Sequence, residues 1–381
     1  MRCAVPAGGV TEPAADVQQQ LAAARARIDA LDVELQRLIS ERATVANEVR
    51  HIKERGGAIG DHYRPSREVQ VLERAMQRNR ELGGPLPDVV MARIVREIMS
   101  ACLALESPIS VAYLGPEGTY TQAAVLKHFG QGVEARPQAT IDDIFREVEA
   151  DATAYGVVPV ENSTEGVISH TLDRLAFTTL SICGEVWLPV HHCLLSRCES
   201  FEQIHTVYSH AQSLGQCRSW LDSHLPGVAR QVVESNGVAA RVVSEAAGEP
   251  CAAIASEVAG RRYGLPVLAT NIEDDPNNTT RFLVIGRKDP APTGHDKTSV
   301  VLELQQNRPG ALFELLRPFA EENVDMMRIE SRPSRRGLWN YYFFIDMEGH
   351  QQDPAVRRVL ERSRTQAAFF KILGSYPQAV I

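Results

Sequence analysis

The chain has 381 residues, with 40 Lys and Arg against 48 Asp and Glu and a formal net charge of -8. This length exceeds what one hydrophobic core usually organises, so two or three domains are expected. The negative charge disfavours nucleic acid or an anionic membrane as a partner, although small anionic substrates can still meet local arginines.

The cysteines and the N-terminus indicate a reducing compartment. The seven cysteines are odd in number and scattered, which is typical of free thiols. Residues 1–16 are interpreted as a flexible tail. Because we find neither a signal peptide nor a run of 18 apolar residues, we expect a cytoplasmic protein without a membrane span.

The first predicted element is an amphipathic helix from Val17 to Arg55, in which apolar residues recur at alternating spacings of three and four. At 1.5 Å per residue it would be about 58 Å long, far beyond the diameter of a 90-residue globule, so we expect it to pack against a partner chain. Two more helices are predicted at Pro65–Glu81 and Val89–Glu106. Residues 17–107 should therefore form an all-α domain.

Cations occupy unusual positions on the long helix. Arg42 falls on the apolar heptad seam, where a buried guanidinium needs an anionic partner. Lys53 lies eleven residues on, about 20° around the helix, so both side chains can converge on one small dianion. Arg25 lies about 25 Å from Arg42 and cannot reach the same ligand within one chain, but it could serve the partner's site. The alternative is a coiled-coil dimerisation arm with solvated charges.

The strings "ARARIDALDVELQRLISERATVANEVRHIK", "YRPSREVQVL" and "IMSACLALE" resemble the all-α class of chorismate mutases. The resemblance implies an intertwined dimer with Arg42, Lys53, Arg67 and Glu68 in one site and Arg25 entering from the other subunit. It also implies a pericyclic rearrangement, in which the protein holds the substrate and donates hydrogen bonds to the breaking ether oxygen.

Three positions depart from the familiar mutase pattern. Arg64 stands where an acidic residue often binds the substrate hydroxyl. Glu106 stands where a Gln often contacts the ether oxygen, and Cys102 where a Ser is common. We therefore expect Lys53 and Glu106 to act on the ether oxygen and Arg64 and Cys102 to line the mutase site.

After Pro108 the pattern changes to short β-rich runs, several of which precede helical patterns, and this predicts an α/β section. The runs are Ile109–Gly115, Tyr155–Val160, Thr206–His210, Cys251–Ser256 and Phe282–Gly286. Val186–Ser196 is interpreted as one strand. A zinc site at His191, His192, Cys193 and Cys198 is disfavoured, because no second ligand pair has finger-like spacing. We expect no metal and no cofactor.

Two strand-to-helix turns offer N–H groups and hydroxyls that suit a carboxylate. One helix begins at Thr119–Thr121, and a second follows the turn at residues 161–166. Each alone is more often an ordinary N-cap. Thr280 and Arg281 immediately precede a strand and offer a hydroxyl and a fixed cation at its edge.

Four motifs in order, "GPEGTYTQAA", "PVENSTEG", "SHAQSLGQC" and "TTRF", resemble prephenate dehydratase. The resemblance implies a domain at 108–287 with two α/β lobes around a cleft, similar to a periplasmic binding protein, and Thr280 as the central catalytic residue. Because a threonine hydroxyl is a weak acid, we expect it to donate a hydrogen bond to the leaving hydroxyl of prephenate. The expected substrate-binding residues are Thr119, Tyr120, Asn162, Ser163, Thr164, Gln212, Arg281 and Phe282.

A hydrophilic linker, Arg287–Lys297, precedes a β-α-β-β-α-β pattern that begins at Thr298. The strings "GALF" and "ESRP" in it resemble the ACT regulatory domain. The resemblance implies a ferredoxin-like α+β domain at 297–381 that binds phenylalanine between paired domains, with a dimerisation module alone as the alternative. The turn at Gly310 offers N–H groups to a carboxylate. The residues expected to bind phenylalanine are Asn307, Pro309, Gly310, Ala311, Leu312, Glu330, Ser331 and Arg332.

Together the resemblances imply an enzyme that converts chorismate to prephenate and prephenate to phenylpyruvate, is inhibited by phenylalanine, and forms a homodimer or higher homo-oligomer. We expect each domain to have its own core. A mutase fused to prephenate dehydrogenase is a weaker hypothesis, because the chain has no G-x-G-x-x-G. A non-catalytic, amino-acid-responsive two-lobed binding protein is another, but Arg42 and Lys53 argue against it.

Overall fold

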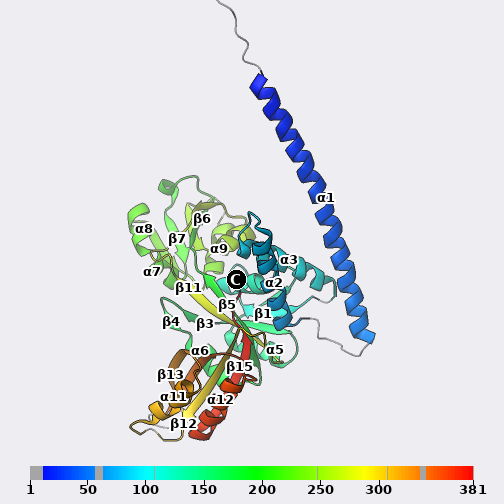
Figure 1. The fold of residues 1–381 in the computed structure, drawn as a ribbon. Helices are drawn as coiled ribbons and strands as arrows, with labels where there is room; N and C mark the ends of the chain where they lie inside the picture. Colours follow the sequence, from blue (N-terminus) through cyan, green and yellow to red (C-terminus); the bar gives the residue numbers. More distant parts are fainter. Residues whose placement is uncertain are drawn as a thin grey trace, which may run out of the picture. The chain divides into compact units, whose positions relative to one another are not determined.

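The computed structural model describes residues 12–55, 63–106, 108–246, 248–306, 308–334 and 340–380 (Figure 1). The side chains of residues 12–15, 53, 54 and 106 lie outside this description. Residues 1–62 and residues 63–381 form two compact units.

One helix, α1 (Glu12–Arg55), makes up the described part of the first unit. It begins five residues before the predicted start and ends at the predicted residue. Arg37 pairs with Glu34 at 2.7 Å and with Glu41 at 2.9 Å, spacings that stabilise a helix surface. A lone helix cannot bury its own apolar stripe, so α1 requires a second surface to be stable.

Two helices open the second unit, α2 (Pro65–Leu82) and α3 (Asp88–Glu106), and both agree with the prediction within one residue. Proline in the first turn favours the start of α2, and Gly83, with φ of 61°, ends it in the left-handed conformation. The two helices pack on each other, and Asn79 donates a hydrogen bond to Asp88 at 2.7 Å.

A mixed sheet in the order β2-β1-β3-β11-β5, with β4 beside β3, forms the first lobe of the α/β section. Its strands are β1 (Ser110–Leu114), β2 (Glu134–Gln138), β3 (Tyr155–Asn162), β4 (Gly166–Val167), β5 (Ser181–Pro189) and β11 (Thr279–Gly286), and its helices are α4 (Tyr120–Phe129), α5 (Ile141–Glu149) and α6 (Ser169–Phe177). Strand β11 comes from the far end of the section and lies antiparallel between β3 and β5. This insertion places Asn162 and Thr280 side by side, although they are 118 positions apart in the sequence.

The second lobe has a sheet in the order β10-β6-β9-β7-β8. Its strands are β6 (Cys193–Ser196), β7 (Thr206–Ser209), β8 (Ala229–Val232), β9 (Cys251–Ala255) and β10 (Val267–Ala269), and its helices are η1 (Phe201–Gln203), α7 (Ala211–Gln216), α8 (Arg218–His224), α9 (Asn236–Glu245) and α10 (Glu257–Tyr263). The five β-rich runs that we predicted in the α/β section are therefore confirmed.

The interpretation of Val186–Ser196 as one strand is wrong. Strand β5 ends at Pro189 in the first lobe, and β6 begins at Cys193 in the second. Between them the carbonyl of His191 accepts from the Tyr120 hydroxyl, and the His192 N–H donates to Glu273. Residues 190–192 bond partly to these side chains and partly to the backbone of Asn278 and Ile272, outside either sheet, where the chain crosses between the lobes.

The C-terminal section has a four-stranded antiparallel sheet in the order β13-β14-β12-β15, with the predicted β-α-β-β-α-β sequence. Its elements are β12 (Asp296–Leu304), α11 (Ala311–Glu321), β13 (Met326–Pro333), β14 (Tyr341–Glu348), α12 (Pro354–Gln366) and β15 (Ala367–Pro377). The predicted ferredoxin-like fold is confirmed. Asp296 and Lys297, assigned to the linker, are buried residues of β12, because the ordered strand begins earlier than the hydrophilic sequence indicates.

The expectation of separate cores is wrong. Ile285 of the first lobe shares a cluster of buried side chains with Val301 and Tyr376 of the C-terminal section. Tyr63, just before α2, packs on Phe129 of α4 with a ring-centroid distance of 5.2 Å. Apolar side chains therefore continue across both junctions, and residues 63–381 behave as one compact unit.

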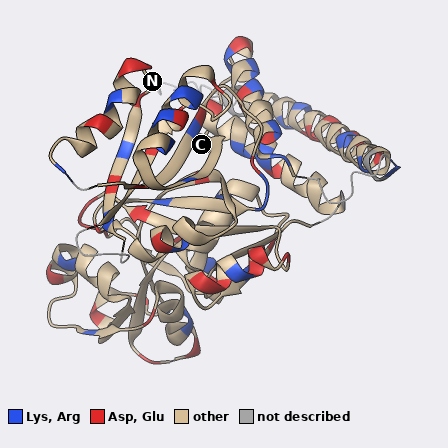
Figure 2. Cartoon of the chain, turned by 90° about the horizontal axis from the view of Figure 1, so that it is seen from below, with Lys and Arg blue, Asp and Glu red and all other residues tan. Residues whose placement is uncertain are grey.

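Acidic and basic residues are interspersed along the helices, α1 included (Figure 2). Among the residues that the structure describes, no helix combines the length and the hydropathy needed to cross a membrane.

Candidate active site

A cleft of ≈ 1350 Å³ lies between the two lobes of the α/β section. Its walls come from the first-lobe strands β1, β3 and β11 and from the second-lobe helices α7 and α9. This volume exceeds the roughly 300–1,000 Å³ of typical small-molecule pockets. Six of the predicted residues line the cleft: Thr119, Tyr120, Asn162, Gln212, Thr280 and Phe282.

The centre of the first-lobe wall is the pair Asn162 and Thr280, which lie opposite each other on β3 and β11. The Asn162 side-chain oxygen accepts from the backbone N–H groups of Thr164 and Glu165, both at 3.0 Å. Because those groups can only donate, the amide orientation is determined and the Asn162 Nδ2 must be a donor. It donates to Thr280 Oγ1 at 2.9 Å, so the proton of the threonine hydroxyl is left for another acceptor.

Asn278, which the sequence did not single out, completes this wall. It lines the cleft, is 2% exposed, and its Oδ1 accepts from Asn162 Nδ2 at 2.8 Å. Its own Nδ2 has no hydrogen-bond partner within the described part of the chain. A buried donor without a partner is costly, so a ligand oxygen in the cleft would stabilise it.

The second predicted carboxylate-binding turn, residues 161–166, differs from the prediction. It leads into the short strand β4 instead of directly into a helix, and α6 begins only at Ser169. The N–H groups of Thr164 and Glu165 are taken by Asn162. They orient the Asn162 amide and are therefore not free to bind a carboxylate in the cleft.

Three of the predicted residues do not line the cleft. Ser163 Oγ accepts from the Thr279 N–H at 3.0 Å, and the Thr164 N–H serves Asn162. Arg281 is 3% exposed and points to the opposite face of β11, toward the C-terminal section. The expectation that Arg281 shapes the cleft is therefore wrong, because successive side chains of a strand alternate between its faces.

Thr119 caps α4 as predicted for an ordinary N-cap. Its hydroxyl donates to the carbonyl of Leu114 at 2.9 Å and accepts from the Gln122 N–H at 3.4 Å. The Gly118 N–H donates to the side chain of Gln122 at 2.6 Å. These bonds hold the start of the helix at the rim of the cleft.

A tyrosine, a histidine and a glutamine form a second polar group in the cleft. The Tyr120 hydroxyl lies 2.8 Å from His192 Nδ1, and His192 Nε2 lies 2.9 Å from Gln216 Oε1. Burial raises the pKa of Tyr120 well above its usual value and lowers that of His192, with the bond to Gln216 partly offsetting the second shift. The trio is therefore neutral near pH 7.

Gln216 was not predicted from the sequence, and His192 was given no role in the cleft. Gln216 lies four residues after Gln212 on α7, so the helical spacing could have indicated a shared face. His192 was considered only as a zinc ligand. In the structure His191 pairs with Glu273 at 2.7 Å, and no group of three or more His, Cys, Asp or Glu side chains suited to a metal occurs in the described ranges.

The predicted mutase residues divide between the two units. Arg25 and Arg42 are exposed on α1, whereas the side chain of Lys53 lies outside the described residues. Arg64 and Arg67 are exposed at the start of α2, and Cys102 is buried on α3. The side chain of Glu106 also lies outside the description.

Glu68 is the predicted mutase residue with the most defined surroundings. It is 7% exposed and pairs with Arg96 of α3 at 3.1 Å. Burial raises the pKa of Glu68, and the charge of Arg96 only partly offsets this. Arg96 also donates to the carbonyl of Lys127 on α4 at 2.8 Å, so Glu68 belongs to the contact between α2, α3 and the first lobe.

The residues predicted to bind phenylalanine lie on two elements of the C-terminal section. Pro309 and Gly310 form the turn before α11, with Gly310 at φ of 82°, and Ala311 and Leu312 begin that helix. On β13, Glu330 and Arg332 share the half-buried face and Ser331 has the exposed one. Arg332 pairs with Asp173 of α6 at 3.1 Å. Asn307 lies outside the described residues.

Three family patterns match successive parts of the chain. Chorismate mutase type II matches residues 24–107, prephenate dehydratase matches residues 111–290, and the ACT domain matches residues 298–364.

Curated relatives match nearly the whole length. A bifunctional chorismate mutase/prephenate dehydratase of Stutzerimonas stutzeri is 52% identical over 366 residues, covering 95% of this chain and 99% of the relative. One from Pseudomonas aeruginosa is 52% identical over 368 residues, with 96% and 99% covered. Among solved structures, prephenate dehydratase of Arthrobacter aurescens in complex with L-Phe is similar with a TM-score of 0.66 and 34% identity, over 71% of this chain and 90% of that one.

Proposed function

Because the chain belongs to the family of bifunctional chorismate mutase/prephenate dehydratases, we propose that it converts chorismate to prephenate and prephenate to phenylpyruvate. The helical section performs the first reaction and the two-lobed section the second. The ACT domain binds phenylalanine and inhibits the dehydratase, and a similar prephenate dehydratase was solved in complex with L-Phe. The protein is cytoplasmic, a proposal supported by its six described cysteines, all of which are free.

The observation that carries the dehydratase proposal is the oriented Thr280 hydroxyl. In the reaction, the carboxylate on the prephenate ring leaves as carbon dioxide, its bonding electrons enter the ring, and the ring hydroxyl leaves with one proton as water. Thr280 accepts from Asn162, so its own proton is available for a hydrogen bond to the leaving hydroxyl. The apolar ring of Phe282 on the same strand face lines the cleft and excludes water from the departing carboxylate.

Incubating the purified protein with chorismate tests the whole proposal. We expect prephenate to form first and phenylpyruvate to follow, both resolved by chromatography and mass spectrometry. Accumulation of prephenate alone would contradict the dehydratase assignment. Binding of amino acids without turnover of either substrate would favour the two-lobed binding protein.

Asn278 contributes a donor to the substrate. We propose that its unpartnered Nδ2 binds a carboxylate oxygen of prephenate. Asn278→Asp keeps the oxygen that accepts from Asn162 but replaces the donor with a negative charge. A hydrogen bond to a charged group contributes about 1.5–3 kcal/mol, so KM for prephenate should rise roughly 10- to 100-fold. Steady-state kinetics with prephenate measures this.

The matched control is Asn277→Asp, which adds the same charge at the exposed neighbouring residue outside the cleft lining. Its KM should stay within about twofold of the parent, because exposed charges interact weakly. Equal KM values for the two variants would show that Asn278 does not contact the substrate.

The mutase site uses the cations of α1. We propose that Arg42 and Lys53 hold the chorismate dianion and that Arg25 reaches the site of a second copy, so the protein is at least a dimer. The helix itself supports this, because its 44 residues at 1.5 Å rise extend about 66 Å and its apolar side chains, Leu31 and Leu35 among them, are exposed and would be buried by a second copy. The mutase chemistry requires positioning and charge stabilisation, without a covalent intermediate.

Glu106 should make the mutase sensitive to pH. The ether oxygen gains negative charge as its bond breaks and needs a donor, which a carboxyl group provides only while protonated. We expect mutase turnover to fall as pH rises and Glu106 ionises. Glu106→Gln should flatten the profile and raise activity at alkaline pH, as measured by chorismate consumption across pH 5–9 or so. An unchanged profile in the Gln variant would mean that Glu106 does not contact the ether oxygen.

A further inference from the structure

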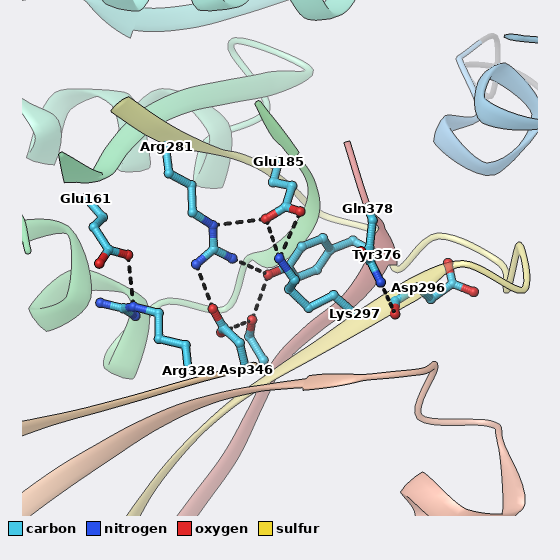
Figure 3. A network of polar contacts seen from close by, with 10 residues as sticks. Glu161, Glu185, Arg281, Asp296, Lys297, Arg328, Asp346, Tyr376 and Gln378 are labelled. Atoms are coloured by element: carbon cyan, nitrogen blue, oxygen red, sulfur yellow. Dashed lines mark hydrogen bonds and ion pairs between the residues drawn. The ribbon is translucent and has the colours of Figure 1, made fainter. Parts of the chain in front are cut away.

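A closed network of buried charges joins the first lobe to the ACT domain (Figure 3). Arg281 of β11 donates to Glu185 of β5 at 2.9 Å and to Asp346 of β14 at 2.6 Å. Lys297 of β12 donates to both oxygens of Glu185, at 2.9 and 2.8 Å. The Tyr376 hydroxyl of β15 accepts from Arg281 at 3.0 Å. Two cations and two anions therefore balance one another across the junction.

Burial makes each member of the network depend on the others. The four charged side chains are all less than a tenth exposed. Burial alone would raise the pKa of Asp346, but the Arg281 guanidinium and the Ser299 hydroxyl outweigh it and hold that pKa below its usual value. Removing one partner leaves an uncompensated buried charge, which destabilises the arrangement of the strands that carry the network.

The network lies on the far side of β11 from the first-lobe wall of the cleft. Arg281 follows Thr280 on β11, so one side chain faces the ACT domain while the other faces the cleft. The register of β11 against β3 shifts between Arg281 and Phe282. Such an irregularity disrupts the ladder locally, close to Thr280, so the anchored guanidinium on the far face gives β11 a second attachment at this point.

Strand β3, which pairs with β11, is also tied to the ACT sheet by an ion pair. Glu161 precedes Asn162 on β3, and it pairs with Arg328 of β13 at 2.9 Å (Figure 3). Glu161 and Arg281 lie opposite each other in the register, as do Asn162 and Thr280. Both members of the catalytic pair therefore have a sequence neighbour that is tied to the ACT sheet.

We propose that Arg281 and Glu161 are positioning residues that hold the Asn162–Thr280 pair, and that the ACT domain supplies their anchors through Asp346 and Arg328. The dehydratase site is then incomplete without the ACT sheet. A displacement of β14 or β13 moves Thr280 or Asn162 through one side chain each. The inference rests on the proposed dehydratase function.

A double-mutant cycle tests the proposal in the full-length chain. Asp346→Asn keeps the shape of the side chain but removes the charge that anchors Arg281. If Arg281 acts through Thr280, the variant should lower kcat for prephenate by about tenfold with KM nearly unchanged, and it should cause no further loss when Thr280 is already alanine. A loss of folded protein would instead multiply with the Thr280→Ala effect. Multiplying effects would overturn the proposal.

Two more variants make the result specific. Glu161→Gln removes the second anchor and should produce the same kcat loss and the same lack of additivity with Thr280→Ala. Asp173→Asn breaks another ion pair to the ACT domain, the one with Arg332, but Asp173 lies on α6 and is not a sequence neighbour of Asn162 or Thr280. Its kcat should stay within about twofold of the parent. An equal kcat loss in Asp173→Asn would contradict the proposal.

The activity of the parent protein distinguishes a failure of this inference from a failure of the proposed function. If the parent makes no phenylpyruvate, the dehydratase proposal fails. If the parent is active and Asp346→Asn keeps full kcat with a melting temperature close to the parent's, the positioning role fails alone. Should Asp346→Asn not fold, Tyr376→Phe removes only the hydroxyl that bonds Arg281 and gives the same cycle with a smaller change.

Discussion

Replacing Thr280 by alanine lowers the turnover of prephenate by about 10²–10³-fold, the typical effect of removing one donor aimed at developing charge. The expectation follows from the Asn162 bond, which leaves the threonine proton for the leaving hydroxyl. Thr280→Ser keeps a hydroxyl and should retain much of the activity. Phenylpyruvate formation under saturating prephenate measures kcat in both variants.

The mutase rate of the same Thr280→Ala protein is the internal control. The substitution removes a hydroxyl and a methyl group on one strand, which is a local change, so the mutase should be unaffected. Thr279→Ala is a second control, because the Thr279 hydroxyl donates to the carbonyl of Asn277 instead of serving Asn162. Retained dehydratase turnover in Thr280→Ala would exclude a catalytic role for this hydroxyl.

Arg25→Ala and Arg42→Ala each abolish most mutase activity alone and restore part of it when mixed. The reason is geometric, because 17 residues of α1 separate the two side chains by about 25 Å and no single chain can bring both to one substrate. In a mixed dimer one site combines the intact Arg42 of one chain with the intact Arg25 of the other. A purified heterodimer should therefore have about half of parent activity, and a random assembly of equal amounts about a quarter.

The measurement is chorismate consumption after co-expression with two different affinity tags, so that heterodimers are purified as such. A chain carrying both substitutions, mixed with parent, provides the control, because its heterodimer should contain no site with both arginines. Absence of recovery in verified heterodimers of the single variants would show that each site takes Arg25 and Arg42 from one chain.

The sequence predicted helices α2 and α3, five β-rich runs of the α/β section and six of the residues that line the cleft. Helical spacing gave the ends of α2 and α3 within a residue, because apolar periodicity and Pro and Gly signals are local. Asn162 and Thr280 were both found from short motifs. Each of these two motifs spans only a few residues next to a strand end, so it could be recognised without knowledge of the tertiary structure.

Tertiary structure alone decided which face each residue serves. Arg281 and Thr280 are adjacent in sequence, yet only the pairing of β11 between β3 and β5 shows that the guanidinium faces the ACT domain and the hydroxyl the cleft. Asn278 gained its role from a bond to Asn162, 116 positions away. The shared cores were equally hidden, because a buried residue looks the same in sequence whichever domain covers it. Contacts between distant segments depend on sheet order and strand register, and no local pattern carries that information.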